Sequence, residues 1–238
     1  EHAKKLILED YMYFACMLVL DGKADGIVSG ACHSSSDTLR PALQIIKSEP
    51  SRKVSSFFLM EVPNCSYGEN GTFIFADCGL QQNPTREELA DIAIESARSF
   101  EQLVGKTPYV AMLSHSTKGS ARHEDINKVV EATKIVKDKY PNYLIDGELQ
   151  LDAAIIPEIA KIKCSDSQVA GRANVLIFPD LDSGNIGYKL VERLANAKAY
   201  GPLTQGMNIP VNDLSRGCSI EDIVGVIAIT VVQASKRK

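Results

Sequence analysis

Residues 72–113, TFIFADCGLQQNPTREELADIAIESARSFEQLVGKTPYVAML, predict a strand, a helix and a second strand in succession. The runs at 72–76 and 109–113 are apolar and rich in β-formers, as strands are. Thr85 and Glu88 have the spacing of a capping box, in which each side chain bonds the other residue's amide. Gly105 follows the last apolar residue of the helical pattern, where a C-terminal glycine is typical.

The same alternation continues on both sides of this segment. We expect further strands at 54–62, 143–145 and 175–178, and further helices at 122–139, 151–162 and 186–197. Strands that alternate with helices indicate a mostly parallel sheet with helices on both faces. Ligands of such sheets sit at the carboxyl ends of the strands. The loops expected to form this rim are 64–71, 114–120, 146–148 and 179–187.

The flanking segments are predicted separately. Helical spacing of apolar residues predicts a helix over 1–20 and another over 36–46, with a short buried strand at 24–28 between them. Near the other end, Ser219 is the expected N-cap of an apolar helix over 220–232. Because the chain starts at Glu1 directly in a helical pattern, we expect a segment upstream of it.

Composition excludes several classes of protein. The chain has 238 residues, of which 45% are hydrophobic and 24% charged, so a disordered or low-complexity protein is excluded. A net charge of −4 argues against a broad nucleic-acid footprint. No apolar stretch reaches the roughly 20 residues of a membrane span. Six scattered cysteines without a CxxC pair indicate reduced thiols and a cytoplasmic location.

Familiar cofactor motifs are absent or incomplete. Gly105-Lys106-Thr107 has the end of a phosphate-binding P-loop, but Phe100 stands where its first glycine belongs. There is no GxGxxG before a helix, no GxSxG elbow, and no HxxxH pair among the four histidines. We therefore expect no metal and no tightly bound cofactor.

The informative stretch is residues 201–219, GPLTQGMNIPVNDLSRGCS, which crowds polar residues into a loop before the last helix. The amides of such a loop and the helix N-terminus can bind an anion. Arg216 adds planar donors suited to phosphate, and Ser215 adds a hydroxyl. Asp222 is a candidate base, although its spacing from Ser219 equally fits a capping box. The residues alone thus support an anion site on an α/β protein.

This stretch resembles the C-terminal signature of the phosphotransacetylase (phosphate acetyltransferase) family. Further stretches resemble the family in the same order, and the resemblance runs from end to end: DGIVSG at 25–30, LRPALQ at 39–44, MLSHSTKGSA at 112–121, DGELQ at 146–150 and FPDLDSGN at 178–185.

The resemblance implies a fold and a reaction. The family fold has two α/β domains with mostly parallel sheets, similar to isocitrate and isopropylmalate dehydrogenases, and an active site in the interdomain cleft. On this chain it implies one domain from 1–55 with 206–238, normally completed by an upstream segment, and a second from 56–205. The reaction is acetyl-CoA plus phosphate to acetyl phosphate plus CoA, reversibly.

The resemblance also implies residue roles. Asp222 is similar to the base that takes the thiol proton of CoA, and Ser215 to the hydroxyl that positions the thiol or stabilises the oxyanion. Arg216 and Arg40 resemble the charges that hold the phosphoryl group. Cys65 corresponds to a cysteine near the CoA site, with a buried strand-end thiol as the alternative. The residues expected to line the CoA cleft are Ser114, Ser116, Lys118 and Asn185.

The resemblance also implies substrates and an assembly, and it leaves alternative functions open. CoA, acetyl-CoA, phosphate and acetyl phosphate are expected as substrates, with direct transfer, no acyl-enzyme, and a cytoplasmic homodimer that binds neither nucleic acid nor membrane. One alternative is a phosphate butyryltransferase. Another is a non-catalytic regulatory module, similar to the domain at the end of some malic enzymes, or an inactive fragment. The presence of Ser215, Arg216 and Asp222 argues against the non-catalytic alternative.

Overall fold

The computed structural model describes residues 1–46 and 53–235 and divides into two compact units. The larger unit is a continuous segment, residues 55–199, and the smaller combines residues 1–54 with 200–238. The resemblance implies boundaries at 55/56 and 205/206. Across the described residues, every helix falls short of the length and apolar character needed to cross a bilayer.

The larger unit is built on a mixed, mostly parallel sheet. Its strands are β2 (Ser55–Glu61), β3 (Thr72–Ala76), β4 (Tyr109–Leu113), β5 (Leu144–Leu149), β6 (Val175–Ile177) and β7 (Lys198–Gln205). Their order in the sheet is β5-β4-β6-β3-β2-β7, and the chain leaves the unit along β7. The pairs β3–β6, β6–β4 and β4–β5 are parallel, whereas β2 and β3 are antiparallel.

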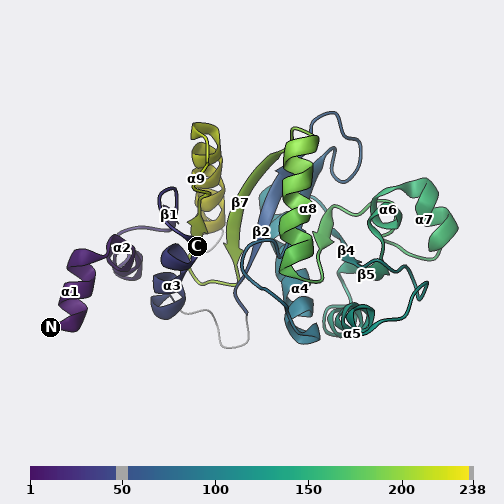
Figure 1. Ribbon diagram of the computed structural model, residues 1–238, viewed down its shortest axis with the longest axis horizontal. Coiled ribbons are helices and arrows are strands. Elements are labelled where there is room, and N and C mark those ends of the chain that lie inside the picture. The colour runs from purple at the N-terminus through teal and green to yellow at the C-terminus, as the bar shows by residue number, and fades with distance from the viewer. Residues whose placement is uncertain (47–52, 236–238) are drawn as a thin grey trace. The chain divides into compact units, whose positions relative to one another are not determined.

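Helices cover both faces of this sheet. On one face α8 (Leu181–Leu194) contacts β2 and β3, as Figure 1 shows, and Tyr188 of α8 stacks on Phe58 with ring centroids 3.9 Å apart. Alternate strand residues point to the other face, where α4 (Arg86–Val104) packs on β3, β4 and β6 and α5 (Glu124–Lys139) packs on β5. Two short helices, α6 (Leu151–Ile155) and α7 (Pro157–Lys163), follow β5.

The smaller unit has a two-stranded parallel sheet of β1 (Ile27–Ser29) and β8 (Val211–Asp213). A buried polar network ties β8 to α9 (Ile220–Ser235): the Asn212 amide donates to Thr230 and Gln233 and accepts from the Thr204 amide. Both polar side-chain atoms of Asn212 thus have hydrogen-bond partners, so this buried network can stabilise the unit. The remaining helices of the unit are α1 (His2–Glu9), α2 (Tyr11–Leu20) and α3 (Ser35–Ile45).

Most elements expected from the sequence are confirmed. The strands at 72–76 and 109–113 have the expected bounds, the Thr85–Glu88 capping box is formed in both directions, and Gly105 ends α4 in the left-handed conformation at φ 71°. Two expected helices are wrong, because each is interrupted. The Asp10 carboxylate accepts from the Met12 and Tyr13 amides and so starts a new helix, and Pro157 starts α7 after a break at Ile156.

Three expected loops are also wrong. Residues 146–148 belong to β5, because they continue its pairing with β4. Residues 181–187 belong to α8, which begins early because the Asp180 carboxylate caps it through the Ser183 amide. Residues 201–219 contain most of β7 and all of β8. Gly201 and Pro202 within β7, and Pro210 just before the three-residue β8, are typical of loops and so hid these strands.

Candidate functional site

The first candidate site lies at the carboxyl edge of the small sheet. Because β1 and β8 are parallel, both strands end at the same edge, where the Leu214 amide donates to the Ser29 carbonyl at 2.7 Å. The chain after β1 enters α3, and the chain after β8 enters α9. The edge therefore gathers two loops that each lead into a helix, which is the usual arrangement of a ligand site in α/β proteins.

Ser215 and Arg216 follow β8 directly at this edge. The Ser215 hydroxyl accepts from the Gly217 amide at 3.3 Å, and its carbonyl accepts from the Cys218 amide at 3.0 Å, so the segment forms a tight turn. Arg216 is exposed and makes no ion pair with any residue in the described ranges. Its guanidinium is therefore available to an anionic ligand.

Arg40 extends from the exposed surface of α3, the helix that follows β1. Its guanidinium lies 3.7 Å from the Asp37 carboxylate, one turn earlier in the helix, and both side chains are more than half exposed. An exposed pair at this distance is weak. The topology thus brings the helix of Arg40 and the turn of Ser215 and Arg216 into one unit.

Asp222 lies in the first turn of α9 and completes a capping box. The Ser219 amide donates to Asp222 Oδ2 at 2.8 Å, and the Asp222 amide donates to the Ser219 hydroxyl at 3.1 Å. The prediction of a capping box between Ser219 and Asp222 is therefore confirmed. The box uses only one carboxylate oxygen, so the geometry leaves Oδ1 of this half-buried side chain for another role.

The second candidate site lies at the carboxyl edge of the larger sheet, in the loop after β4. Ser116 is fully buried and donates to Glu148 Oε1 at 2.8 Å, and the Gly119 amide donates to the same oxygen at 2.7 Å. The Lys118 ammonium donates to Asp146 Oδ1 at 2.6 Å. Side chains of β5 thus hold the loop that carries three of the residues expected to line the CoA cleft, Ser114, Ser116 and Lys118.

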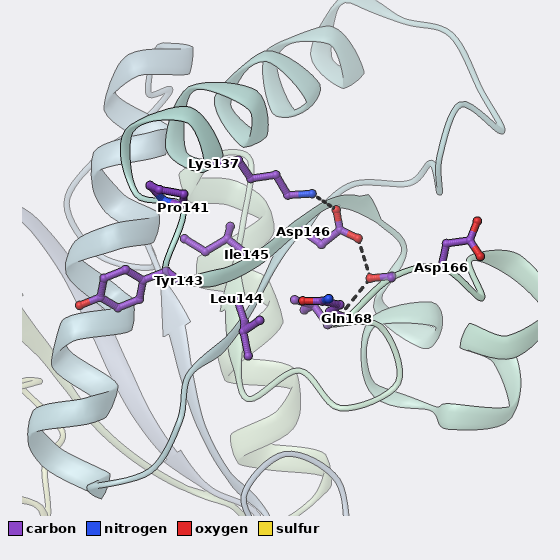
Figure 2. A pocket seen from close by; sticks show the side chains of 10 residues that line it. Lys137, Pro141, Tyr143, Leu144, Ile145, Asp146, Asp166 and Gln168 are labelled. Carbon is purple, nitrogen blue, oxygen red and sulfur yellow. Dashed lines mark hydrogen bonds and ion pairs between the residues drawn. The ribbon is translucent and has the colours of Figure 1, made fainter.

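Asp146 is the centre of this arrangement. Lys118 and Lys137 both donate to its Oδ1 at 2.6 Å, and the Ser167 hydroxyl donates to Oδ2 at 2.5 Å. Burial alone would raise the pKa of Asp146, but the hydrogen bonds from these three residues outweigh it and lower the pKa to about 2. Figure 2 shows Lys137 directed at the carboxylate beside a cavity of about 410 Å³.

The remaining residues expected to lie near CoA are Asn185, Ser114 and Cys65, and they do not all lie at this edge of the sheet. Asn185 lies in α8 and donates to the Cys78 carbonyl at 3.0 Å, just after β3 at the same carboxyl edge. Ser114 accepts from the Ser116 amide at 3.2 Å. Cys65 follows β2, which runs against β3, so it lies at the opposite edge of the sheet. The expected rim is therefore wrong for the loop at 64–71.

Two charged residues of the structure, Lys137 and Asp213, were not predicted as site residues from the sequence. Lys137 lies on the helix preceding β5, and nothing in the helical pattern distinguishes it from neighbouring surface lysines. Asp213 ends β8 and is 1% exposed. Burial raises its pKa, against the opposite influence of the Ser35 and Thr38 hydroxyls and the Leu214 amide. The only signal for Asp213 was its place inside the 201–219 stretch.

Comparison with known proteins gives consistent matches over nearly the whole chain. A family model described as phosphate acetyl/butaryl transferase matches residues 1–231. Phosphate acetyltransferase of Acetivibrio thermocellus is 61% identical over 98% of this chain and 70% of its own length. That of Thermoanaerobacterium thermosaccharolyticum is 63% identical over 98% and 71%. The crystal structure of a phosphotransacetylase from Streptococcus pyogenes superposes with a TM-score of 0.90 at 51% identity, covering 97% of this chain and 69% of that one.

We predict that Asp146→Asn destabilises the protein at neutral pH. A folded pKa near 2 against the ordinary 3.8 corresponds to roughly 2 kcal/mol of unfolding free energy above pH 4. Because the folded pKa is lowered, this contribution disappears as the pH falls from about 4 to about 2. Urea unfolding of both proteins at a series of pH values measures the difference.

Asp166→Asn is the matched control, because Asp166 lines the same cavity with an exposed carboxylate. It should leave the unfolding free energy nearly unchanged. A difference between wild type and Asp146→Asn that stays constant from pH 7 down to pH 2 would contradict the assignment.

Proposed function

The chain belongs to the phosphate acetyl/butaryl transferase family, and we propose that the edge of the small sheet carries out acetyl transfer while the edge of the larger sheet holds the rest of CoA. The chain is an acyltransferase, and its activity is the reversible reaction of acetyl-CoA and phosphate to give acetyl phosphate and CoA. One observation supports placing the transfer chemistry at the edge of the small sheet. Ser215, Arg216 and Asp222 follow one short strand, whose partner strand leads into the helix of Arg40.

The phosphoryl group is assigned to the edge of the small sheet. Arg216 has a guanidinium without a protein partner among the described residues, and a planar guanidinium binds a phosphoryl group with two parallel hydrogen bonds. Arg40, whose pair with Asp37 is exposed and long, supplies a second charge. Both cations also stabilise negative charge that develops during transfer.

Asp222 and Ser215 are assigned to the thiol of CoA. A thiol has a pKa of about 8.5, so only a few per cent is ionised at neutral pH, and a base accelerates the reaction. Asp222 takes the thiol proton with its uncommitted oxygen, while the capping box fixes the carboxylate. The sulfur attacks the acetyl carbon of acetyl phosphate, and the bond from this carbon to the phosphate oxygen breaks. Ser215 stabilises the oxyanion, and no acyl-enzyme forms.

CoA itself is assigned to the edge of the larger sheet. Ser116, Lys118 and Asn185 are held there by Glu148, Asp146 and the Cys78 carbonyl. Because the hydroxyl of Ser116 is buried and committed, it contributes by fixing the loop rather than by direct contact. The assignment of Cys65 to CoA stays a prediction from the resemblance, as does the interdomain cleft.

Two measurements on the intact protein test the activity and its acyl preference. With acetyl-CoA and phosphate, equal amounts of acetyl phosphate and CoA should form, also in excess EDTA, because the arginines supply the countercharge. Turnover with butyryl-CoA should be slower by roughly tenfold or more, because a pocket that fits an acetyl group discriminates against additional methylenes. Faster turnover of butyryl-CoA would favour the butyryltransferase alternative, and no turnover of either would favour the non-catalytic one.

A homodimer is the expected assembly of the intact protein. Ile220, Val224, Ile227 and Val231 form an apolar stripe along α9 and are each between 47% and 77% exposed. A stripe of this kind favours burial against another surface. Light scattering should give twice the mass of one chain at micromolar concentration. A monomer under these conditions contradicts the expectation.

We predict that Asp222→Asn separates the two roles of this carboxylate. As a base, its loss lowers kcat by roughly 10²–10⁴-fold while acetyl-CoA still binds. As a cap alone, its loss costs about 0.3–1 kcal/mol of stability and little activity. Turnover and thermal unfolding should be measured on the same preparation.

Ser219→Ala is the matched control, because it removes the cap hydroxyl and leaves the carboxylate, at a typical cost of ~1 kcal/mol. If both variants lose turnover equally and only in step with stability, Asp222 is a cap residue. Loss of turnover confined to Asp222→Asn supports the base.

A further inference from the structure

Asp213 is a buried carboxyl that the transfer reaction does not use. It is the last residue of β8 and stands two residues before Ser215. Its neighbour Asn212 points to the other face of the strand and has its amide atoms satisfied by Thr204, Thr230 and Gln233. Asp213 therefore lies on the opposite face, where its carboxyl is close to Gly30 and to the first turn of α3.

The residue after β1, Gly30, leaves room for the Asp213 side chain. A Cβ added at Gly30 would overlap Asp213 Oδ1 and would lie 2.7 Å from the Leu214 amide nitrogen. Gly30 has a φ of 110°, a conformation that favours glycine. The residue after β1 therefore has no side chain, and the Asp213 carboxyl occupies that space.

The first turn of α3 lies against the same carboxyl. Asp213 Oδ1 and Thr38 Oγ1 are both buried, and neither has a hydrogen-bond partner among residues 1–46 and 53–235. The Ser35 and Thr38 hydroxyls are close enough to influence the acidity of Asp213. Buried polar atoms without partners are rare in folded proteins, so this contact between β8 and α3 needs an explanation.

We propose that Asp213 is a positioning residue, which fixes the turn of Ser215 and Arg216 against the first turn of α3 by filling the space over Gly30. This inference rests on the proposed function. The carboxyl sets the spacing between the end of β8 and the helix that carries Arg40. A displacement of about 1 Å in such a group can cost roughly 10²-fold in rate.

The test compares three variants of the intact protein. Asp213→Asn keeps the shape of the side chain and removes its charge. Asp213→Ser keeps a polar group but empties the space over Gly30. Thr230→Val is the matched control, because it removes a buried hydroxyl of the same unit on the opposite side of β8. Each variant is assayed for kcat and for the KM of acetyl-CoA, and its melting temperature is measured.

The proposal predicts a kcat about 10²-fold lower for Asp213→Ser, with the KM of acetyl-CoA and the activity of Asp213→Asn within about threefold of wild type. Thr230→Val should lower the melting temperature at least as much as Asp213→Ser and keep its kcat. Equal losses in Asp213→Ser and Thr230→Val would show a merely structural role. An Asn variant as impaired as the Ser variant would show that charge, not shape, matters.

Hydrogen exchange provides a readout that does not depend on activity. Backbone amides of residues 214–218 should exchange faster in Asp213→Ser than in wild type or Thr230→Val. Unchanged exchange in Asp213→Ser overturns the positioning role even if turnover falls. An inactive wild-type protein with faster exchange in this variant overturns the proposed function and leaves the positioning role standing.

Discussion

The parallel pairing of β1 with β8 is the constraint on which the proposed reaction site depends. Three residue pairs, Ile27 with Val211, Val28 with Asn212 and Ser29 with Asp213, join segments from opposite ends of the chain. The Leu214 amide extends the pairing past the end of β8 by donating to the Ser29 carbonyl. Parallel strands end at one edge, so this pairing brings the turn of Ser215 and Arg216 into the same unit as α3 and its Arg40.

In the larger unit, the carboxylates of Asp146 and Glu148 hold the loop after β4 in place. Two lysines and a serine satisfy the Asp146 carboxylate, and Glu148 accepts from the Ser116 hydroxyl and the Gly119 amide. Hydrogen bonds to an ionised group are the strong ones. The loop after β4 is thereby fixed by two acidic side chains of the neighbouring strand, which in turn fixes Lys118.

Features of the fold that depend on interactions between residues close in sequence were predicted correctly. The capping box of Thr85 and Glu88 and the stop at Gly105 follow from short-range hydrogen bonds, and the sequence locates both correctly. The pairing of Ser219 with Asp222 was visible from spacing, although spacing alone left a cap and a base as alternatives. Pairing between distant segments is not encoded locally. The antiparallel run of β2 beside β3, which separates Cys65 from Ser116, and the continuation of β5 through Asp146 therefore escaped prediction.

The most direct test of the account is a crystal structure of the intact protein with acetyl phosphate bound. Phosphoryl oxygens should lie within hydrogen-bonding distance of the Arg216 guanidinium, and the acetyl carbonyl should be directed at Ser215. Acetyl phosphate bound beside Asp146 in the larger unit, with Arg216 still facing solvent, would contradict the central claim that the edge of β1 and β8 assembles the reaction site.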